Sequence, residues 1–258
     1  FENIVITKGA INQIIDVCTF VETDDGKVVP IAEQKDAILK LYHKFSEEGL
    51  RTLGLAWKKC DVSKDFTRDD EKDMIFSGFI TLFDPPKEDV AETIAKLNKL
   101  GVSLKIITGD NALVAKSIST QLGIPNPVIL TGSEIREMND SAMIHKVSTV
   151  QIFAEVEPNQ KERIILSLKK GGNVVGFMGD GINDASAIHA ADVGVSVDTA
   201  VDVAKEAADI VLLDHDLRVL IQGIAEGRKT FANTMKYVLM ATSANFGNMF
   251  SMAGASLF

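Results

Sequence analysis

Short apolar runs alternate with amphipathic segments of helical length between residues 84 and 224, and this alternation constrains the fold more than any other feature. Several of the helical segments stop at glycine, as helices commonly do. The pattern is typical of an α/β protein with mostly parallel strands. The predicted strands are Ser103–Ile107, Gln151–Val156, Val174–Met178, Val193–Val197 and Ile210–Leu213, and the predicted helices include Glu88–Leu100, Ala112–Leu122 and Pro158–Lys170. We expect one doubly wound parallel sheet over residues 84–224.

Residues 1–83 have a different pattern and form a separate predicted unit. A helix is expected over Ile31–Glu48, where apolar residues recur at helical spacing before Gly49. Strand-like segments lie at Asn3–Thr7 and Met74–Leu82, and residues 58–73 form a charged loop. We interpret this unit as an incomplete α+β domain. Two prolines in the connector Asp84–Lys87 stiffen its junction with the α/β domain.

The stretch from Tyr237 to Phe258 carries no charged residue. A helix needs about 20 residues to cross a bilayer, so this stretch is long enough to begin a membrane span. Its polar residues also allow a second interpretation, a buried amphipathic helix of a soluble protein. We expect residues 225–258 to form a stalk and the start of a transmembrane helix, because uncharged runs of this length are uncommon in globular domains.

Composition excludes several classes of function. Lysine and arginine total 27 against 36 aspartate and glutamate, and this net charge of −9 disfavours nucleic acid as a partner. The two cysteines and four histidines are not spaced as zinc ligands, so we expect reduced thiols and mostly cytosolic exposure. Because Phe1 is not methionine and no signal peptide is recognisable, we expect the chain to be part of a longer protein.

The first candidate site follows the strand that ends at Ile107. Thr108, Gly109, Asp110 and Asn111 precede a predicted helix, so a hydroxyl, a glycine amide and a helix N-terminus converge there. Proteins hold phosphate in this way. The alternative is a plain helix cap, for which threonine and aspartate are common residues.

The second candidate site follows the strand that ends at Met178. Asp180, Asn183 and Asp184 lie in one glycine-rich turn, and oxygen ligands of this kind suit Mg²⁺, which shares them with phosphate. The alternative is again a capped turn, although two aspartates so close together favour a bound cation. Lys161 begins the helix after Pro158, where a cation is unfavourable unless an anion lies nearby.

Three of these segments, in this order, resemble motifs of the haloacid dehalogenase superfamily: TGDN at 108–111, PNQK at 158–161 and MGDGINDA at 178–185. The DPPK connector at 84–87 resembles that of P-type ATPases within this superfamily. Lys8, Gly9 and Ala10 look like the KGA segment of their nucleotide-binding domain, and Gly49, Leu50 and Arg51 look like its arginine turn. ADVGVSV, EAADIVLL and GRKTFANTMKY continue the likeness, and TSANFGN at 242–248 is most similar to the fifth membrane helix of bacterial Mg²⁺-translocating members.

This resemblance implies roles for individual residues. Asp180 would coordinate Mg²⁺ with support from Asp184. Thr108 and Gly109 would hold the phosphoryl oxygens beside Asp110, while Lys161 would neutralise developing charge and Asn183 would hydrogen-bond the phosphate. Lys8, Gly9 and Arg51 would bind ATP in the other domain. Without the family, Lys8 and Arg51 read as ordinary surface residues.

The sequence departs from the family at two points. The DKTGT motif, which carries the phosphorylated aspartate, is absent, so we expect this chain alone to hydrolyse neither ATP nor phosphate esters. Asp214, His215 and Asp216 imitate the superfamily's DxD nucleophile, but they follow the last motif, and we interpret them as a turn capping the stalk helix. Ser186 replaces a proline that is common in the family, and this change removes no ligand.

The resemblance therefore predicts part of an ATP-driven pump that forms an aspartyl phosphate and imports Mg²⁺, with Mg²⁺ and ATP as cofactors. Its partners would be the rest of the pump, namely the actuator domain, the DKTGT segment and the other membrane helices, together with the lipid bilayer. The whole protein would be a multi-pass cell-membrane protein, with residues 1–83 and 84–224 in the cytoplasm as nucleotide-binding and phosphorylation domains. The alternatives are a pump for another cation such as Ca²⁺, a soluble phosphatase of the superfamily, and a degenerate regulatory module.

Overall fold

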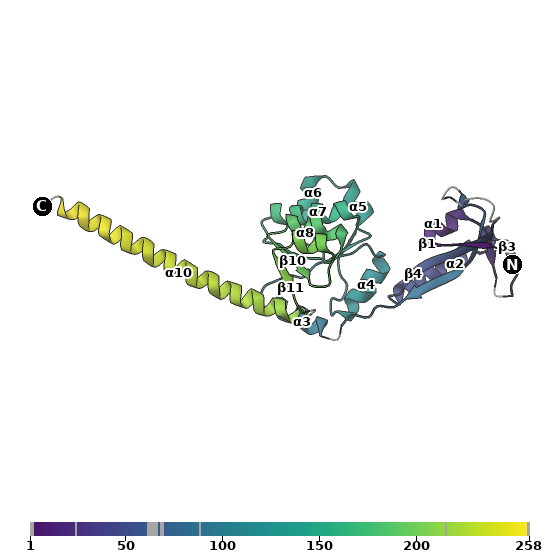
Figure 1. The fold of residues 1–258 in the computed structure, drawn as a ribbon, viewed down its shortest axis with the longest axis horizontal. Coiled ribbons are helices and arrows are strands. Elements are labelled where there is room, and N and C mark those ends of the chain that lie inside the picture. The colour runs from purple at the N-terminus through teal and green to yellow at the C-terminus, as the bar shows by residue number, and fades with distance from the viewer. Residues whose placement is uncertain are drawn as a thin grey trace.

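The computed structural model describes residues 3–23, 25–60, 67, 70–87, 89–214 and 216–256. Figure 1 shows three parts in a row: an N-terminal lobe (residues 3–82), a central domain (residues 89–214) and a long C-terminal helix that points away from both. The whole is a mixed α/β structure with several sheets, as the sequence predicts.

The N-terminal lobe is built on a five-stranded sheet of order β1-β4-β5-β2-β3. The pairs are antiparallel except for β2 with β5, which is parallel. The strands are β1 (Ile4–Ala10), β2 (Cys18–Glu22), β3 (Val28–Pro30), β4 (Arg51–Lys59) and β5 (Met74–Leu82). Residues from α1 (Ile11–Val17) and α2 (Ile31–Glu47) share one apolar core with Ala56 and Phe76 of the sheet. The predicted α+β character of this part is therefore confirmed, and half of the charged loop lies outside the described residues.

The central domain contains two parallel sheets of three strands each, where the sequence predicts a single sheet. One has the order β6-β8-β7, and the other has the order β11-β10-β9. The strands are β6 (Ile106–Ile107), β7 (Ile129–Thr131), β8 (Ile152–Ala154), β9 (Gly176–Met178), β10 (Val193–Val197) and β11 (Ile210–Leu212). The expected continuous sheet is therefore not confirmed, since no ladder joins β6 to β9 among the described residues.

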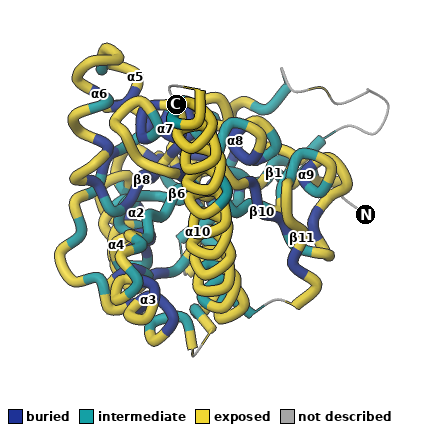
Figure 2. The backbone as a smooth tube through the Cα atoms, turned by 90° about the vertical axis from the view of Figure 1, so that its left-hand side faces the viewer, coloured by how far each residue is buried: buried dark blue, intermediate teal, exposed yellow. Residues whose placement is uncertain are grey.

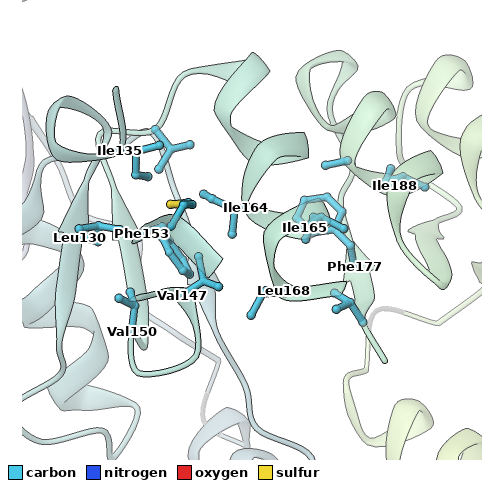
Figure 3. Packing of buried hydrophobic residues seen from close by; sticks show 14 of the residues in the cluster. Leu130, Ile135, Val147, Val150, Phe153, Ile164, Ile165, Leu168, Phe177 and Ile188 are labelled. Carbon is cyan, nitrogen blue, oxygen red and sulfur yellow. The ribbon is translucent and has the colours of Figure 1, made fainter. Parts of the chain in front are cut away.

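Helix α7 (Pro158–Lys170) lies in the core that both sheets share. Its buried residues Ile164, Ile165 and Leu168 belong to one cluster with Phe153 of β8 and Phe177 of β9 (Figure 3). The other helices of the domain are α3 (Val90–Lys99), α4 (Ala112–Gln121), α5 (Gly132–Glu137), α6 (Asp140–Val147), α8 (Ala185–Ala190) and α9 (Asp202–Ala207), with a 3₁₀ turn at Ile182–Asp184.

The C-terminal helix α10 (Arg218–Ala255) has 38 residues and no buried side chain. Figure 2 shows it as a mostly exposed tube along its whole length. Near its start it packs on α3, and the Arg228 guanidinium donates to the Leu100 carbonyl at 2.6 Å. The predicted membrane helix is not confirmed, because in the described part of the chain no helix combines the length and hydropathy of a bilayer span.

The packing of α7 predicts a large loss of stability when its core face is truncated. Ile164 is fully buried, so Ile164→Ala should lower the free energy of unfolding by about 3 kcal/mol, through lost burial and the cavity left behind. Leu166 lies on the same helix but is exposed, so Leu166→Ala should cost less than about 1 kcal/mol. Urea unfolding of the 258-residue chain, followed by circular dichroism, measures both. Equal losses for the two variants would show that α7 does not pack as described.

Candidate functional site

The loop between β6 and α4 is held by backbone hydrogen bonds to β8 and to the segment that follows it. The Thr108 N–H donates to the Phe153 carbonyl at 2.9 Å, and the Val156 N–H donates to the Thr108 carbonyl at 3.0 Å. The Glu155 N–H donates to the Asp110 carbonyl at 2.9 Å. These hydrogen bonds fix the backbone of residues 108–110, which are called the phosphate loop from here on, after the role that the sequence predicts for them.

The side chains of the phosphate loop are not used as helix caps. Thr108 Oγ1 accepts from the Asp110 N–H at 3.1 Å and lies 3.1 Å from Asp110 Oδ2. The cap of α4 is Asn111, whose Oδ1 accepts from the Leu113 N–H at 2.7 Å. Because Asn111 does the capping, the plain helix-cap interpretation does not account for Thr108 and Asp110.

In the second loop, Asp184 is buried and its two carboxylate oxygens have different partners. Lys161 Nζ, from the first turn of α7, lies 2.6 Å from Asp184 Oδ1, and the two side chains are only 16% and 12% exposed. The Gly181 N–H donates to Asp184 Oδ2 at 3.2 Å. Gly179 is required here, since a Cβ at this position would lie 2.5 Å from the Asp184 Cβ. This arrangement is more than a turn cap, because it buries a charged pair between two helices.

Asp180 and Asn183 occupy the outer side of the same loop. Both residues are exposed, and the Asp180 carbonyl accepts from the Val201 N–H at 3.1 Å. Among the described residues, no group of three or more His, Cys, Asp or Glu side chains is placed to hold a metal ion. Two carboxylates still fit Mg²⁺, which commonly takes one or two protein carboxylates together with water and phosphate oxygens.

Lys8 and Gly9 on β1 and Arg51 on β4 belong to neighbouring strands of the N-terminal lobe. Lys8 pairs with Leu55 in the β1–β4 ladder, and Arg51 lies an even number of residues away along β4, so both side chains project from the same face of the sheet. Gly9 pairs with Gly54, and a Cβ on Gly54 would lie 3.0 Å from the Ile14 Cβ. Glycine at position 54 therefore lets α1 pack closely against these strands.

The structure also joins this lobe to the phosphate loop, which the sequence does not predict. Arg51 Nε lies 2.9 Å from Asp110 Oδ1, and Asn111 Nδ2 donates to the Tyr42 hydroxyl at 2.6 Å. These bonds accompany the packing of α2 on α4, and α4 lies between the two parts in Figure 1. A residue assigned to ATP by resemblance is therefore in direct contact with one assigned to phosphate.

The predicted site residues thus form two groups. One contains Arg51 and the phosphate loop, and the other contains Lys161 and the turn of Asp180, Asn183 and Asp184. In the described part of the chain, no hydrogen bond or ion pair connects Thr108, Gly109 or Asp110 with the second group.

Of the residues that imitate a nucleophile, Asp216 has a structural role. Asp216 accepts from the Arg218 N–H at 2.8 Å, at the start of α10, and from Arg218 Nε at 2.7 Å. These hydrogen bonds hold the pKa of the Asp216 carboxyl below its usual value. The predicted turn at the start of the stalk helix is confirmed for Asp216, while His215 lies outside the described residues.

Sequence reasoning missed Tyr42, Glu155 and Gln160, which support the site from outside. No local signal in the sequence marks Tyr42 or Glu155. The hydrogen-bond partner of Tyr42 is distant in sequence, and the role of Glu155 depends on its unusual backbone angle. Gln160 does carry one: it precedes Ile164 by four residues and therefore lies on the buried face of α7.

The buried pair predicts that Lys161 contributes to stability as well as to any chemistry. Lys161→Met should lower the free energy of unfolding by about 3 kcal/mol, because it leaves the Asp184 carboxylate buried without its cation. The exposed pair Lys96–Glu92 on α3 is the control, and Lys96→Met should cost less than about 0.5 kcal/mol. Urea unfolding at neutral pH measures both losses, and a small loss for Lys161→Met would mean that Asp184 is well solvated.

Comparison with known proteins tests the resemblance that the motifs predict. Residues 2–89 match the family model of the P-type ATPase cytoplasmic domain N. The chain is 43% identical over 255 residues to the magnesium-transporting ATPase, P-type 1, of Escherichia coli K12, and 41% identical over 256 residues to a protein of that name from Salmonella typhimurium LT2. It is 35% identical over 251 residues to calcium-transporting ATPase 1 of Bacillus cereus.

These alignments cover 98%, 98% and 96% of this chain, respectively, but only 28% of each relative. The chain thus spans little more than a quarter of the length of the proteins that it matches. The comparisons confirm the resemblance predicted from the motifs: residues 2–89 match a P-type ATPase family model, and nearly the whole chain is similar to P-type ATPases.

Proposed function

We propose that this chain is the ATP-binding and phosphorylation part of a cation pump that forms an aspartyl phosphate and imports Mg²⁺. The observation that carries the proposal is the buried pair of Lys161 and Asp184, whose aspartate lies in the same loop as the exposed Asp180. In this proposal, the pair supplies a cation for a phosphoryl group and a carboxylate for its Mg²⁺. The identity to magnesium-transporting relatives exceeds that to the calcium-transporting ones, and this difference favours Mg²⁺ as cargo.

In this proposal, each loop binds a different part of the phosphorylation site. Asp180 and Asp184 would hold Mg²⁺, which neutralises charge on the phosphoryl oxygens when it is bound. Thr108 and Gly109 would hold those oxygens from the side of β6, with Asp110 bracing the loop. Lys161 would neutralise developing charge, and Asn183 would donate a hydrogen bond to the phosphate.

ATP would bind on the N-terminal lobe, on the face from which Lys8 and Arg51 project. The Arg51–Asp110 ion pair supports this idea, because it shows that the face reaches the phosphate loop. A nucleotide held by Lys8, Gly9 and Arg51 could therefore direct its phosphates toward Thr108. The proposed domains are residues 1–83 for nucleotide binding, 84–224 for phosphorylation, and 225–258 for the stalk and the start of a membrane helix, although α10 already begins at Arg218.

We further propose that the two three-stranded sheets are halves of one haloacid dehalogenase-like sheet. Both are wholly parallel, and their strands share one apolar core through α7. A strand carrying DKTGT from elsewhere in the pump would pair between the edge strands β6 and β9. That strand would bring the phosphorylated aspartate between the phosphate loop and Asp180, since ligand sites form beyond the carboxyl ends of parallel strands.

The complete pump would supply the remaining partners, namely an actuator domain, further membrane helices and the bilayer around them. In that setting, most of this chain would be cytoplasmic in a multi-pass membrane protein. Large apolar side chains exposed along the second half of α10, among them Leu239, Phe246 and Phe250, support a partner for this helix.

The role of Asp180 is tested by removing its charge in the complete pump. Asp180→Asn should abolish phosphoenzyme formation from labelled ATP while leaving the fold intact, because the amide keeps the shape of the side chain but binds Mg²⁺ poorly. Asp202, an exposed aspartate on α9, provides the control, and Asp202→Asn should label normally. Normal labelling of the Asp180 variant would remove this residue from the metal site.

The transported ion is tested at Asn245 and Asn248, which lie three residues apart on one face of α10. Amides at membrane depth are costly unless they are paired or line a polar pathway, and neutral oxygens could receive Mg²⁺ or its bound waters. Replacing either residue with leucine in the complete pump should reduce Mg²⁺ uptake severalfold at unchanged expression. Asn233→Leu, nearer the start of α10, should leave uptake unchanged.

Two results would count against this assignment. Normal Mg²⁺ uptake by both variants would remove the asparagines from the ion pathway and leave them as contacts between helices. The second result concerns ATP hydrolysis by the unmodified pump. If hydrolysis depends on Ca²⁺ as the transported ion and is independent of Mg²⁺ as the transported ion, Mg²⁺ is excluded as the cargo.

A further inference from the structure

The turn after β8 has an unusual backbone that holds the phosphate loop. Glu155 has a φ of +57°, in the left-handed region that residues other than glycine rarely adopt. The N–H of this residue and that of Val156 bind the carbonyls of Asp110 and Thr108, at the two ends of the loop. A strained conformation costs about 1 kcal/mol or more and persists only where neighbouring residues enforce it. The residues that enforce this turn therefore also control the phosphate loop.

Gly132 and Glu157 flank the turn, and the Gln160 side chain connects them. Gly132, the first residue of α5, lies so close that a Cβ there would be 2.2 Å from the Glu155 carbonyl oxygen. The Gln160 side chain is only 5% exposed; its Nε2 donates to the Gly132 carbonyl at 2.8 Å, and its Oε1 accepts from the Glu157 N–H at 3.0 Å. The amide thus ties the start of α5 to the turn that leads into α7.

Gln160 also precedes Lys161 in the first turn of α7. The direction of this first turn determines where the Lys161 ammonium lies relative to Asp184, 2.6 Å away. One buried side chain is therefore connected to both groups of site residues, which no direct hydrogen bond joins among the described residues.

We propose that Gln160 is a positioning residue for phosphoryl transfer: through Gly132 and the left-handed turn, it sets the phosphate loop and the Lys161 ammonium relative to each other. This inference rests on the proposed function. Among the described residues, the Gln160 side chain makes its hydrogen bonds to Gly132 and Glu157 and none to the phosphate loop or Asp184. It acts through these residues and takes no part in the chemistry itself.

The chemistry of the two contacts explains why the residue is glutamine. The site requires one donor and one acceptor without charge, and a side-chain amide supplies both. Leucine supplies neither. An ionised glutamate has no donor for the Gly132 carbonyl, whereas a protonated glutamate has one O–H to donate and one oxygen to accept.

The test uses the complete pump, with the rate of phosphoenzyme formation from ATP in a single turnover as the readout. Gln160→Leu should slow this step about tenfold or more, because small displacements of positioned groups cost large factors in rate. The ATP concentration for half-maximal rate should stay within about twofold, because Lys8 and Arg51 lie in the other lobe. Ser167→Ala is the matched control: Ser167 is equally buried on α7, and its hydroxyl donates to the Arg163 carbonyl within the same helix.

A second variant separates positioning from general loss of stability. Burial raises the pKa of a carboxyl group, so Gln160→Glu should be protonated at about pH 6 and increasingly ionised toward about pH 8. Its rate relative to the unmodified pump should therefore rise as the pH falls, while the ratio for Ser167→Ala stays constant. Thermal unfolding of the 258-residue variants at both pH values shows whether the fold is retained.

The outcomes are distinct. A normal single-turnover rate for Gln160→Leu, or a pH-independent ratio for a folded Gln160→Glu pump, would overturn the positioning role. If the unmodified pump forms no acid-stable phosphoenzyme, the proposed function fails, whatever the role of Gln160. A slow, pH-rescued step with unchanged dependence on ATP is the result we expect.

Discussion

The burial of α7 is the interaction on which the rest of the central domain depends. Ile164, Ile165 and Leu168 are almost completely removed from water, and each such side chain contributes about 1.5–3 kcal/mol relative to an exposed one. They are buried among side chains from both parallel sheets, so the helix holds together two sheets that share no strand ladder. The positions of the polar residues at the start of α7 depend on this packing. The apolar core around α7 therefore directs the Gln160 side chain toward α5 and the Lys161 side chain toward Asp184.

Much of the fold could be predicted because its longer elements have a regular hydrophobic period. Helices α2, α4 and α7 and strand β5 lie where periodicity and glycine stops place them. Other elements are too short for a hydrophobic period to emerge, namely helices α1, α5 and α6 and strands β2, β3 and β7. Helices α1 and α5 have only about two turns, and strands β3 and β7 have three residues each. The parallel pairing of β2 with β5 depends on contacts between segments far apart in sequence. The sequence predicts the strands of the central domain other than β7, but not their separation into two sheets.

The candidate site was predictable where one rule about parallel strands applies. Thr108 and Asp180 both follow strands, and ligand sites lie at the carboxyl ends of such strands. The contacts between lobes were not predictable in this way. Tyr42 and Asn111 are 69 positions apart, and nothing in the local sequence of either indicates the other. The same is true of the Arg51–Asp110 pair, which the packing of α2 on α4 brings together.

The form of α10 has a mechanical consequence. At about 1.5 Å per residue, its 38 residues extend for about 57 Å, while its contacts with α3 and Leu100 lie close to one end. The helix is therefore attached to the central domain near its start, and most of its length extends beyond this attachment. A rotation of about 5° at the anchored end would move the far end sideways by about 5 Å, roughly the height of one helical turn. A small rearrangement around α3 would thus be amplified along the chain without any change in the helix itself.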